Sequence, residues 1–239
     1  MRIIAVIPAR YAATRFPAKL MQLLGDQPVI LHTYRNTVAT GLFADVFVVT
    51  DSEIIFNTIT AAGGKAIMSK QEHESGTDRI AEAVEDMNVD VIINVQGDEP
   101  FVKKEPLEIL CNRFKDPLVE VASLMHVITD KEMIRDPNCV KVVVNRNMDA
   151  LYFSRSAVPY QRDEKTHVNY FKHIGIYGYR KDILLKFTTL PPSVLEQTEK
   201  LEQLRLLENM ISIRMSVTEP WSVSIDTPQD LEKAKKLLK

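Results

Sequence analysis

The chain has 239 residues, of which 45% are hydrophobic, so it can bury the core of one large domain, or of a domain with a smaller lobe, without a disulfide or a metal. Its net charge of −2 gives no indication that it binds a polyanion such as nucleic acid. The only apolar run near the N-terminus has about five residues, which is too short for a signal peptide or a membrane span, so we expect a cytoplasmic protein with no membrane partner.

Strands and helices alternate through the first hundred residues. The apolar runs that indicate buried strands are 3–7, 45–50, 65–68 and 89–95. The helices predicted between these strands are 29–40, 51–62 and 77–87. This βαβαβ order is typical of a parallel sheet covered by helices with right-handed crossovers.

The second half of the chain has a less regular pattern. We predict further strands at 120–127 and 140–145, and helices at 103–114, 194–209 and 228–238. Short strands and a connecting arm at about 150–190 indicate a smaller lobe or a dimer contact. We therefore expect one domain over 1–239, an α/β fold with a mixed, mainly parallel sheet and flanking helices. Cys111 and Cys139 lie in apolar segments and fit neither a disulfide framework nor a zinc site, so we expect reduced, buried thiols.

A cationic loop follows the first strand. It contains Arg10, Arg15 and Lys19. The loop at the carboxyl end of a strand in an open α/β sheet is where ligands bind, and arginine and lysine together suit a polyphosphate. A solvated basic loop is the alternative that composition leaves open.

Two aspartates are candidates for holding a divalent cation. Asp98 follows the apolar strand at 89–95, and Asp226 precedes the last predicted helix. A hard cation that bridges phosphates is usually held by one or two carboxylates. Each aspartate could equally be an ordinary turn or helix-start residue, and their spacing does not show that they meet.

No glycine-rich signature of a dinucleotide dehydrogenase or a P-loop kinase is present. The chain instead resembles the 3-deoxy-manno-octulosonate (Kdo) cytidylyltransferases, also called CMP-Kdo synthetases, over nearly its whole length. The motifs that carry the resemblance are 7–19 (IPARYAATRFPAK), 74–79 (ESGTDR), 94–100 (NVQGDEP), 150–155 (ALYFSR), 173–179 (HIGIYGY), 201–205 (LEQLR) and 226–231 (DTPQDL).

The resemblance implies a nucleotide-diphospho-sugar transferase-like fold, a homodimer, and transfer of CMP from CTP to Kdo with Mg²⁺ for lipopolysaccharide biosynthesis. It implies catalytic roles for Lys19, Asp98 and Asp226, with the two aspartates as metal ligands. The nucleotide-binding residues that it implies are Arg10, Arg15, Lys19, Ser75, Gly76, Arg79 and Gln96. The substrate-binding residues that it implies are Arg155, Arg162, His173, Tyr177, Glu202 and Gln203.

Several alternatives stay open at this point. His173 could be an ordinary core histidine, and Glu202 could simply pair with Arg205 on one helix. The substrate could be an 8-amino analogue or a sialic acid, the base could differ from cytosine, or the chain could bind a nucleotide without catalysis. The sequence departs from the family at Ala18 and Ser224, where glycine is usual, so a positive φ at either residue would be strained.

Overall fold

The computed structural model describes residues 1–12, 16–73, 75–163, 165–219 and 224–238. The chain divides into two units, the first made of residues 1–108, 180–188 and 221–239 and the second of residues 109–179 and 189–220. Most of the region at 150–190 falls in the second unit.

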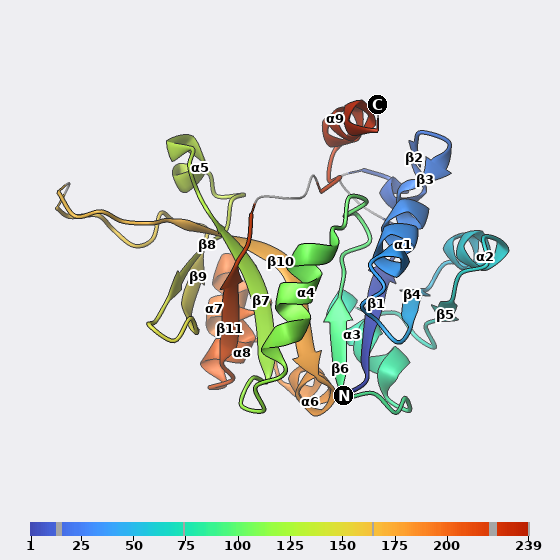
Figure 1. The fold of residues 1–239 in the computed structure, drawn as a ribbon, viewed down its shortest axis with the longest axis horizontal. Coiled ribbons are helices and arrows are strands. Elements are labelled where there is room, and N and C mark those ends of the chain that lie inside the picture. The colour runs from blue at the N-terminus through green and yellow to red at the C-terminus, as the bar shows by residue number, and fades with distance from the viewer. Residues whose placement is uncertain (13–15, 74, 164, 220–223, 239) are drawn as a thin grey trace. The chain divides into compact units, whose positions relative to one another are not determined.

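The first unit is built on a parallel sheet with β1 near its centre (Figure 1). Its strands, in the order in which they pair, are β6 (Val91–Asn94), β1 (Ile3–Ala9), β4 (Val46–Thr50) and β5 (Ala66–Met68). The side chains from Ile4 to Ile7 have no exposed area, which is why this strand is a continuous apolar run.

Among the described residues, five helices belong wholly or mostly to the first unit. They are α1 (Val29–Ala39), α2 (Glu53–Ala61), α3 (Gly76–Val84), α6 (Lys181–Thr189) and α9 (Pro228–Leu237). α1 and α2 pack against β4, and α3 packs against β1 and β4. The 3-10 helix η1 (Lys19–Met21) and the hairpin of β2 (Leu23–Leu24) and β3 (Gln27–Pro28) follow β1. Helix α4 (Lys104–Arg113) crosses the boundary between the units in sequence.

The second unit contains mixed strand pairing. Its strands are β7 (Val121–Val127), β8 (Lys141–Val144), β9 (Ala150–Ser154), β10 (Phe171–Arg180) and β11 (Ile213–Val217). β7 pairs in parallel with β11 and antiparallel with β10, and β8 pairs antiparallel with β9 and β10. The short helices are α5 (Lys131–Arg135), α7 (Val194–Glu199) and α8 (Leu204–Glu208). Residues 155–163 and 165–170 belong to the arm that extends from β9 before the chain returns in β10 (Figure 1).

These elements confirm the predicted α/β fold with a mixed, mainly parallel sheet and flanking helices. Both cysteines are free and buried, as predicted. Within the described ranges, no helix has the length and hydropathy needed to cross a membrane. The sequence analysis did not predict η1, the β2–β3 hairpin, α5, α6 or β11, and the dimer contact at 150–190 stays a prediction.

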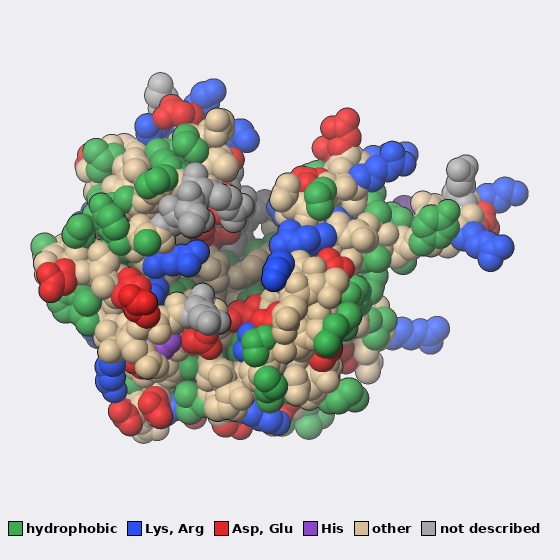
Figure 2. Space-filling view, turned by 180° about the vertical axis from the view of Figure 1, so that it is seen from behind, with side chains coloured by type: hydrophobic (Ala, Val, Ile, Leu, Met, Phe, Trp, Pro, Cys, Tyr) green, Lys and Arg blue, Asp and Glu red, His purple; other side chains and the backbone are tan. Residues whose placement is uncertain are grey.

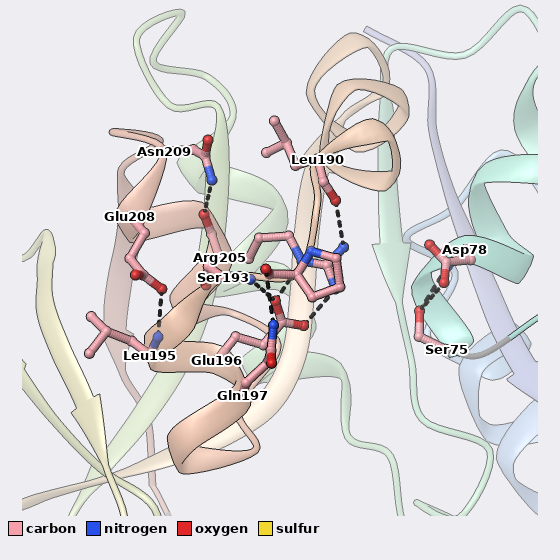
Figure 3. A network of polar contacts seen from close by, with 11 residues as sticks. Ser75, Asp78, Leu190, Ser193, Leu195, Glu196, Gln197, Arg205, Glu208 and Asn209 are labelled. Carbon is pink, nitrogen blue, oxygen red and sulfur yellow. Dashed lines mark hydrogen bonds and ion pairs between the residues drawn. The ribbon is translucent and has the colours of Figure 1, made fainter.

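The prediction of one long helix at 194–209 is wrong. The structure has two short helices instead, because Lys200 ends α7 in the left-handed region with φ 53°. Arg205 stabilises this break, since its Nε and Nη2 donate to the two carboxylate oxygens of Glu196 at 2.7 and 2.5 Å (Figure 3). Its Nη1 donates to the carbonyl of Leu190 at 3.3 Å. The guanidinium therefore ties α8 back to α7 and to the segment before it.

We predict that Arg205→Met lowers the free energy of unfolding by about 2 kcal/mol, because the mostly buried carboxylate of Glu196 loses a bidentate partner. Lys235→Met, which removes the more exposed ion pair with Glu232, is the control and should change it by less than about 0.5 kcal/mol. Urea unfolding measures both. An Arg205→Met effect as small as that of the control would contradict the role given to Arg205.

The ion pair between Arg205 and Glu196 predicts that the free energy of unfolding depends on pH. Burial works to raise the pKa of Glu196, but hydrogen bonds from Arg205 and from the backbone N–H of Ser193 outweigh it and lower the pKa below 4.5. A lowered folded pKa gives stability that is complete above pH 4.5 and is lost as the pH falls through the folded value. The difference in unfolding free energy between the wild type and Arg205→Met should therefore shrink in acid.

Candidate active site

A cavity of about 360 Å³ opens in the first unit where the carboxyl ends of β1 and β6 meet. Most of the predicted catalytic and nucleotide-binding residues line it: Arg10, Lys19, Ser75, Gly76, Arg79, Gln96, Asp98 and Asp226. Arg15 lies outside the described residues. The parallel pairing explains the grouping, because strands that run in the same direction deliver the loops after them to one edge of the sheet.

The N-terminus of α3 forms one wall of the cavity. Ser75 caps the helix, since its Oγ accepts a hydrogen bond from the backbone N–H of Asp78 at 3.1 Å and lies 2.9 Å from the Asp78 carboxylate (Figure 3). Gly76 permits the close approach to β1, because a Cβ at this position would lie 3.2 Å from a carbon of Pro8. Free N–H groups at a helix N-terminus attract anions, so this wall suits a phosphate or a polar base edge.

Lys19, Asp98 and Asp226 form the charged centre of the cavity. The Lys19 ammonium is paired with Oδ2 of Asp98 and lies 3.0 Å from Oδ1 of Asp226. The backbone N–H of Ile225 donates to the carbonyl of Asp98 at 3.0 Å, which fixes the two aspartate segments side by side. Burial works to lower the pKa of Lys19, but the two carboxylates outweigh it and raise the pKa above 10.5. Lys19 is therefore fully charged at neutral pH.

The two aspartates fit a divalent cation that also binds substrate phosphates. Their carboxylate oxygens converge on one lysine nitrogen, so they lie close enough to share a cation. Among the described residues, no group of three or more His, Cys, Asp or Glu side chains forms a complete metal cage. Mg²⁺ typically takes one or two carboxylates and completes its coordination with waters and phosphate oxygens.

Arg79 serves the fold more than a ligand. Its side chain is buried, its Nη1 donates to the carbonyl of Ala9 at 3.0 Å, and its Nη2 donates to Asp51 at 2.5 Å. It therefore joins the last residue of β1 to the residue that follows β4. Its Nε is buried with no hydrogen-bond partner in the described structure, so one donor remains for a bound molecule.

His73 and Glu82 were not predicted as site residues from the sequence. His73 lines the cavity, and its Nε2 lies 2.9 Å from Oε2 of Glu82 on α3. Burial works to raise the pKa of Glu82, but hydrogen bonds from His73 and from the backbone N–H of Lys70 lower it. Through its contacts with His73 and Lys70, Glu82 thus fixes the position of the loop before α3. The only available signal was position, since His73 directly precedes the ESGTDR motif.

The second unit contains the predicted sugar-binding residues around β10. The ring centroids of His173 and Tyr177 lie 5.3 Å apart, and the ring centroids of Phe153 and His173 lie 5.0 Å apart. Burial and the charge of Lys172 lower the pKa of His173 to about 3, so its imidazole is neutral at physiological pH. Its Nε2 lies 3.2 Å from the hydroxyl of Ser123.

Two predicted sugar-binding residues carry buried polar atoms with no partner in the described structure. These atoms are the hydroxyl of Tyr177 and Nε2 of Gln203. Burial raises the pKa of Tyr177 well above 10, and Tyr179 and Glu202 raise it further against the opposing effect of the nearby Ser123 hydroxyl, so the Tyr177 hydroxyl stays protonated. Buried polar groups are normally paired, so these two groups have hydrogen-bonding capacity that the described residues do not fill.

Arg155 and Arg162 have different surroundings. The Arg155 guanidinium donates to the carbonyls of Glu199, Pro137 and Lys200 at 2.7, 3.0 and 3.4 Å, so it supports the fold around β9 and α7. Arg162 is exposed on the arm. The carboxylate of Glu202 contributes to the raised pKa of Tyr177. Arg205, which the sequence suggested as a partner of Glu202, forms a bidentate ion pair with Glu196.

Ala18 adopts the conformation that the sequence analysis identified as strained. Its φ of 49° and ψ of 34° lie in the left-handed region, directly before Lys19. A hydrogen bond from the backbone N–H of Met21 to the Ala18 carbonyl at 2.8 Å stabilises this strained backbone.

The fold and the cavity define a nucleotidyltransferase of the α/β class. Residues 4–213 match the cytidylyltransferase family, to which the chain therefore belongs, and within it the chain is a member of the 3-deoxy-manno-octulosonate cytidylyltransferases. The enzyme of that name from Flavobacterium johnsoniae is 57% identical over 100% of this chain and 99% of the relative. The enzyme from Christiangramia forsetii is 51% identical over 99% and 97%.

A solved structure of CMP:2-keto-3-deoxy-manno-octonic acid synthetase complexed with CTP is also similar. It is 42% identical, with a TM-score of 0.95 over 100% of this chain and 98% of that chain.

We predict that Ala18→Gly raises the free energy of unfolding by about 1 kcal/mol, because glycine removes the Cβ from a left-handed backbone. Ala61→Gly, at the last helical position of α2, is the control and should lower the free energy of unfolding by about 0.5 kcal/mol. Urea unfolding of both variants measures the two changes in the free energy of unfolding, which should have opposite signs. Equal destabilisation by both substitutions would show that Ala18 is not strained.

Proposed function

We propose that this chain transfers CMP from CTP to the anomeric hydroxyl of Kdo, which gives CMP-Kdo and pyrophosphate. The observation that carries the proposal is the convergence of Lys19, Asp98 and Asp226 in a cavity at the strand ends of the first unit. Membership of the 3-deoxy-manno-octulosonate cytidylyltransferases supports the choice of both substrates.

The residues of the first unit bind and orient the triphosphate. Arg10 and Lys19 supply positive charge, and the N-terminus of α3 at Gly76 supplies backbone N–H groups for a phosphate or the cytosine edge. Asp98 and Asp226 would hold Mg²⁺, which offsets charge on the phosphate oxygens and on the departing pyrophosphate. The protein itself forms no covalent intermediate, because in-line attack of the sugar hydroxyl on the α-phosphorus breaks the bond to pyrophosphate directly.

The residues of the second unit bind the sugar. The Tyr177 hydroxyl and Gln203 Nε2 are buried donors without partners, and a sugar with several hydroxyls offers acceptors for both. The neutral imidazole of His173 lies beside Tyr177 and holds its ring in place. Glu202 and Arg162 are further candidates for the sugar hydroxyls and the sugar carboxylate.

We also propose a homodimer, a cytoplasmic location and a role in lipopolysaccharide biosynthesis. The exposed arm supports the dimer, since Tyr160 on it has 87% of its area exposed and Figure 2 shows apolar and charged side chains along its length. The free cysteines Cys111 and Cys139 are consistent with a reducing compartment. The pathway follows from the product, because an activated Kdo is the donor for adding that sugar to a glycan.

The direct test is release of pyrophosphate from CTP. Release should require both Kdo and Mg²⁺, and omission of either should abolish it. An 8-amino analogue or sialic acid in place of Kdo, and UTP in place of CTP, should be poor substrates. A faster reaction with one of these replacements would change the proposed substrate, and no turnover with any pair would overturn the enzymatic function.

We predict that Asp98→Asn lowers kcat/KM at least about 100-fold with little change in stability, because it removes one charge at nearly constant volume. The exposed Asp26→Asn is the control and should keep wild-type turnover. Pyrophosphate release and thermal unfolding measure both variants. Near-normal turnover of Asp98→Asn would remove Asp98 from the site.

We predict that Tyr177→Phe raises the KM for Kdo about tenfold and leaves the KM for CTP unchanged, because only the sugar uses the hydroxyl. The free energy of unfolding should change by less than about 1 kcal/mol, since the variant removes a buried hydroxyl whose neighbour, the Ser123 hydroxyl, keeps its bonds to the carbonyls of Ile174 and Ile176. Tyr160→Phe on the arm is the control. An equal rise in both KM values would show that the hydroxyl supports the fold.

A further inference from the structure

The Lys19 ammonium occupies the position that a shared cation would take. It pairs with Oδ2 of Asp98 and lies 3.0 Å from Oδ1 of Asp226. We infer that Lys19 is a placeholder: it holds the two carboxylates together in the ligand-free protein and leaves them for the triphosphate when a divalent cation binds. This inference rests on the proposed metal-binding role of Asp98 and Asp226.

The two carboxylates need a positive charge between them. Two negative groups that face one point repel each other, and a single ammonium offsets only one of the two charges. Both aspartates are partly shielded from solvent, with 19% of the Asp98 side chain and 45% of the Asp226 side chain exposed. Without Lys19, the pair would therefore separate or bind another cation.

A divalent cation and the ammonium cannot occupy this position together. Both would occupy the space between the two carboxylates, and their positive charges would repel each other at this separation. Binding of a cation to the nucleotide-free protein must therefore break the two Lys19 contacts. This competition weakens metal binding in the absence of the nucleotide.

The triphosphate supplies another partner for Lys19. The lysine lines the same cavity as Arg10 and the N-terminus of α3, and its four-carbon stem is flexible enough to turn toward a phosphate there. A phosphate that accepts the ammonium frees the carboxylates for the cation. Nucleotide and metal binding are therefore positively coupled through this one side chain, and the coupling acts in both directions. The protein thus takes up the metal chiefly together with its nucleotide.

Mn²⁺ binding to the nucleotide-free protein, followed by electron paramagnetic resonance, tests the placeholder role without any turnover. Lys19→Gln and Lys19→Met remove the ammonium, and both should bind Mn²⁺ at least about fivefold more tightly than the wild type. Lys65→Gln, which removes the ion pair with Asp45 elsewhere in the first unit, is the matched control and should bind as the wild type does. Asp98→Asn should lose most of the binding.

Thermal unfolding provides a second measurement on the same variants and shows whether they are folded. Without metal, Lys19→Gln should have a lower Tm than the wild type, because its two carboxylates repel each other. Mg²⁺ should raise the Tm of Lys19→Gln more than that of the wild type.

Two results would overturn the inference, and they are distinguishable. If the Lys19 variants bind Mn²⁺ no more tightly than the wild type while Asp98→Asn binds it less, the metal site stands and Lys19 is no placeholder. If Asp98→Asn binds Mn²⁺ as the wild type does, the metal site of the proposed function is itself wrong.

Discussion

The Lys19 ammonium lies between the carboxylates of Asp98 and Asp226, and this ionic contact fixes the geometry of the cavity in the ligand-free first unit. It joins three segments that are far apart in the sequence: the loop after β1, the turn after β6 and the residues before α9. The strained backbone at Ala18 and the hydrogen bond from Ile225 to Asp98 both serve to place these groups. The cavity therefore depends on backbone positions as much as on the side chains that line it.

The two units provide different chemistry. The first unit offers charge, helix N–H groups and two carboxylates, which suit a triphosphate with its cation. The second offers neutral buried donors, since the pKa of Tyr177 is raised and that of His173 is lowered. Neutral donors with no internal partner suit the hydroxyls of a sugar. This division of charged and neutral groups is what the proposed reaction requires.

The sequence was sufficient to predict the strands of the first unit, because β1 and β6 are buried on both faces and are continuous apolar runs. It did not predict the break in the helix at 194–209, because hydrophobic periodicity does not report the left-handed backbone of Lys200. The spacing of Asp98 and Asp226 did not show that they meet, and only the family resemblance indicated it. Glu82 was missed because a carboxylate inside a helix usually faces solvent, whereas here it anchors a loop.

Two arginines that were predicted to bind ligands make most of their hydrogen bonds within the protein. Arg79 and Arg155 were predicted as ligand-binding residues, yet most of their hydrogen bonds are made to the protein itself. Arginine has several donors in a fixed fork, so sequence alone does not tell which of them are used within the fold.

The central claim is that Asp98 and Asp226 hold one divalent cation together with the nucleotide. Crystals grown with CTP and Mn²⁺, measured at a wavelength where manganese scatters anomalously, test it most directly. The account predicts an anomalous peak in direct contact with an oxygen of each aspartate, with the Lys19 ammonium on a phosphate. A peak that contacts neither aspartate, with Lys19 still between them, would contradict it.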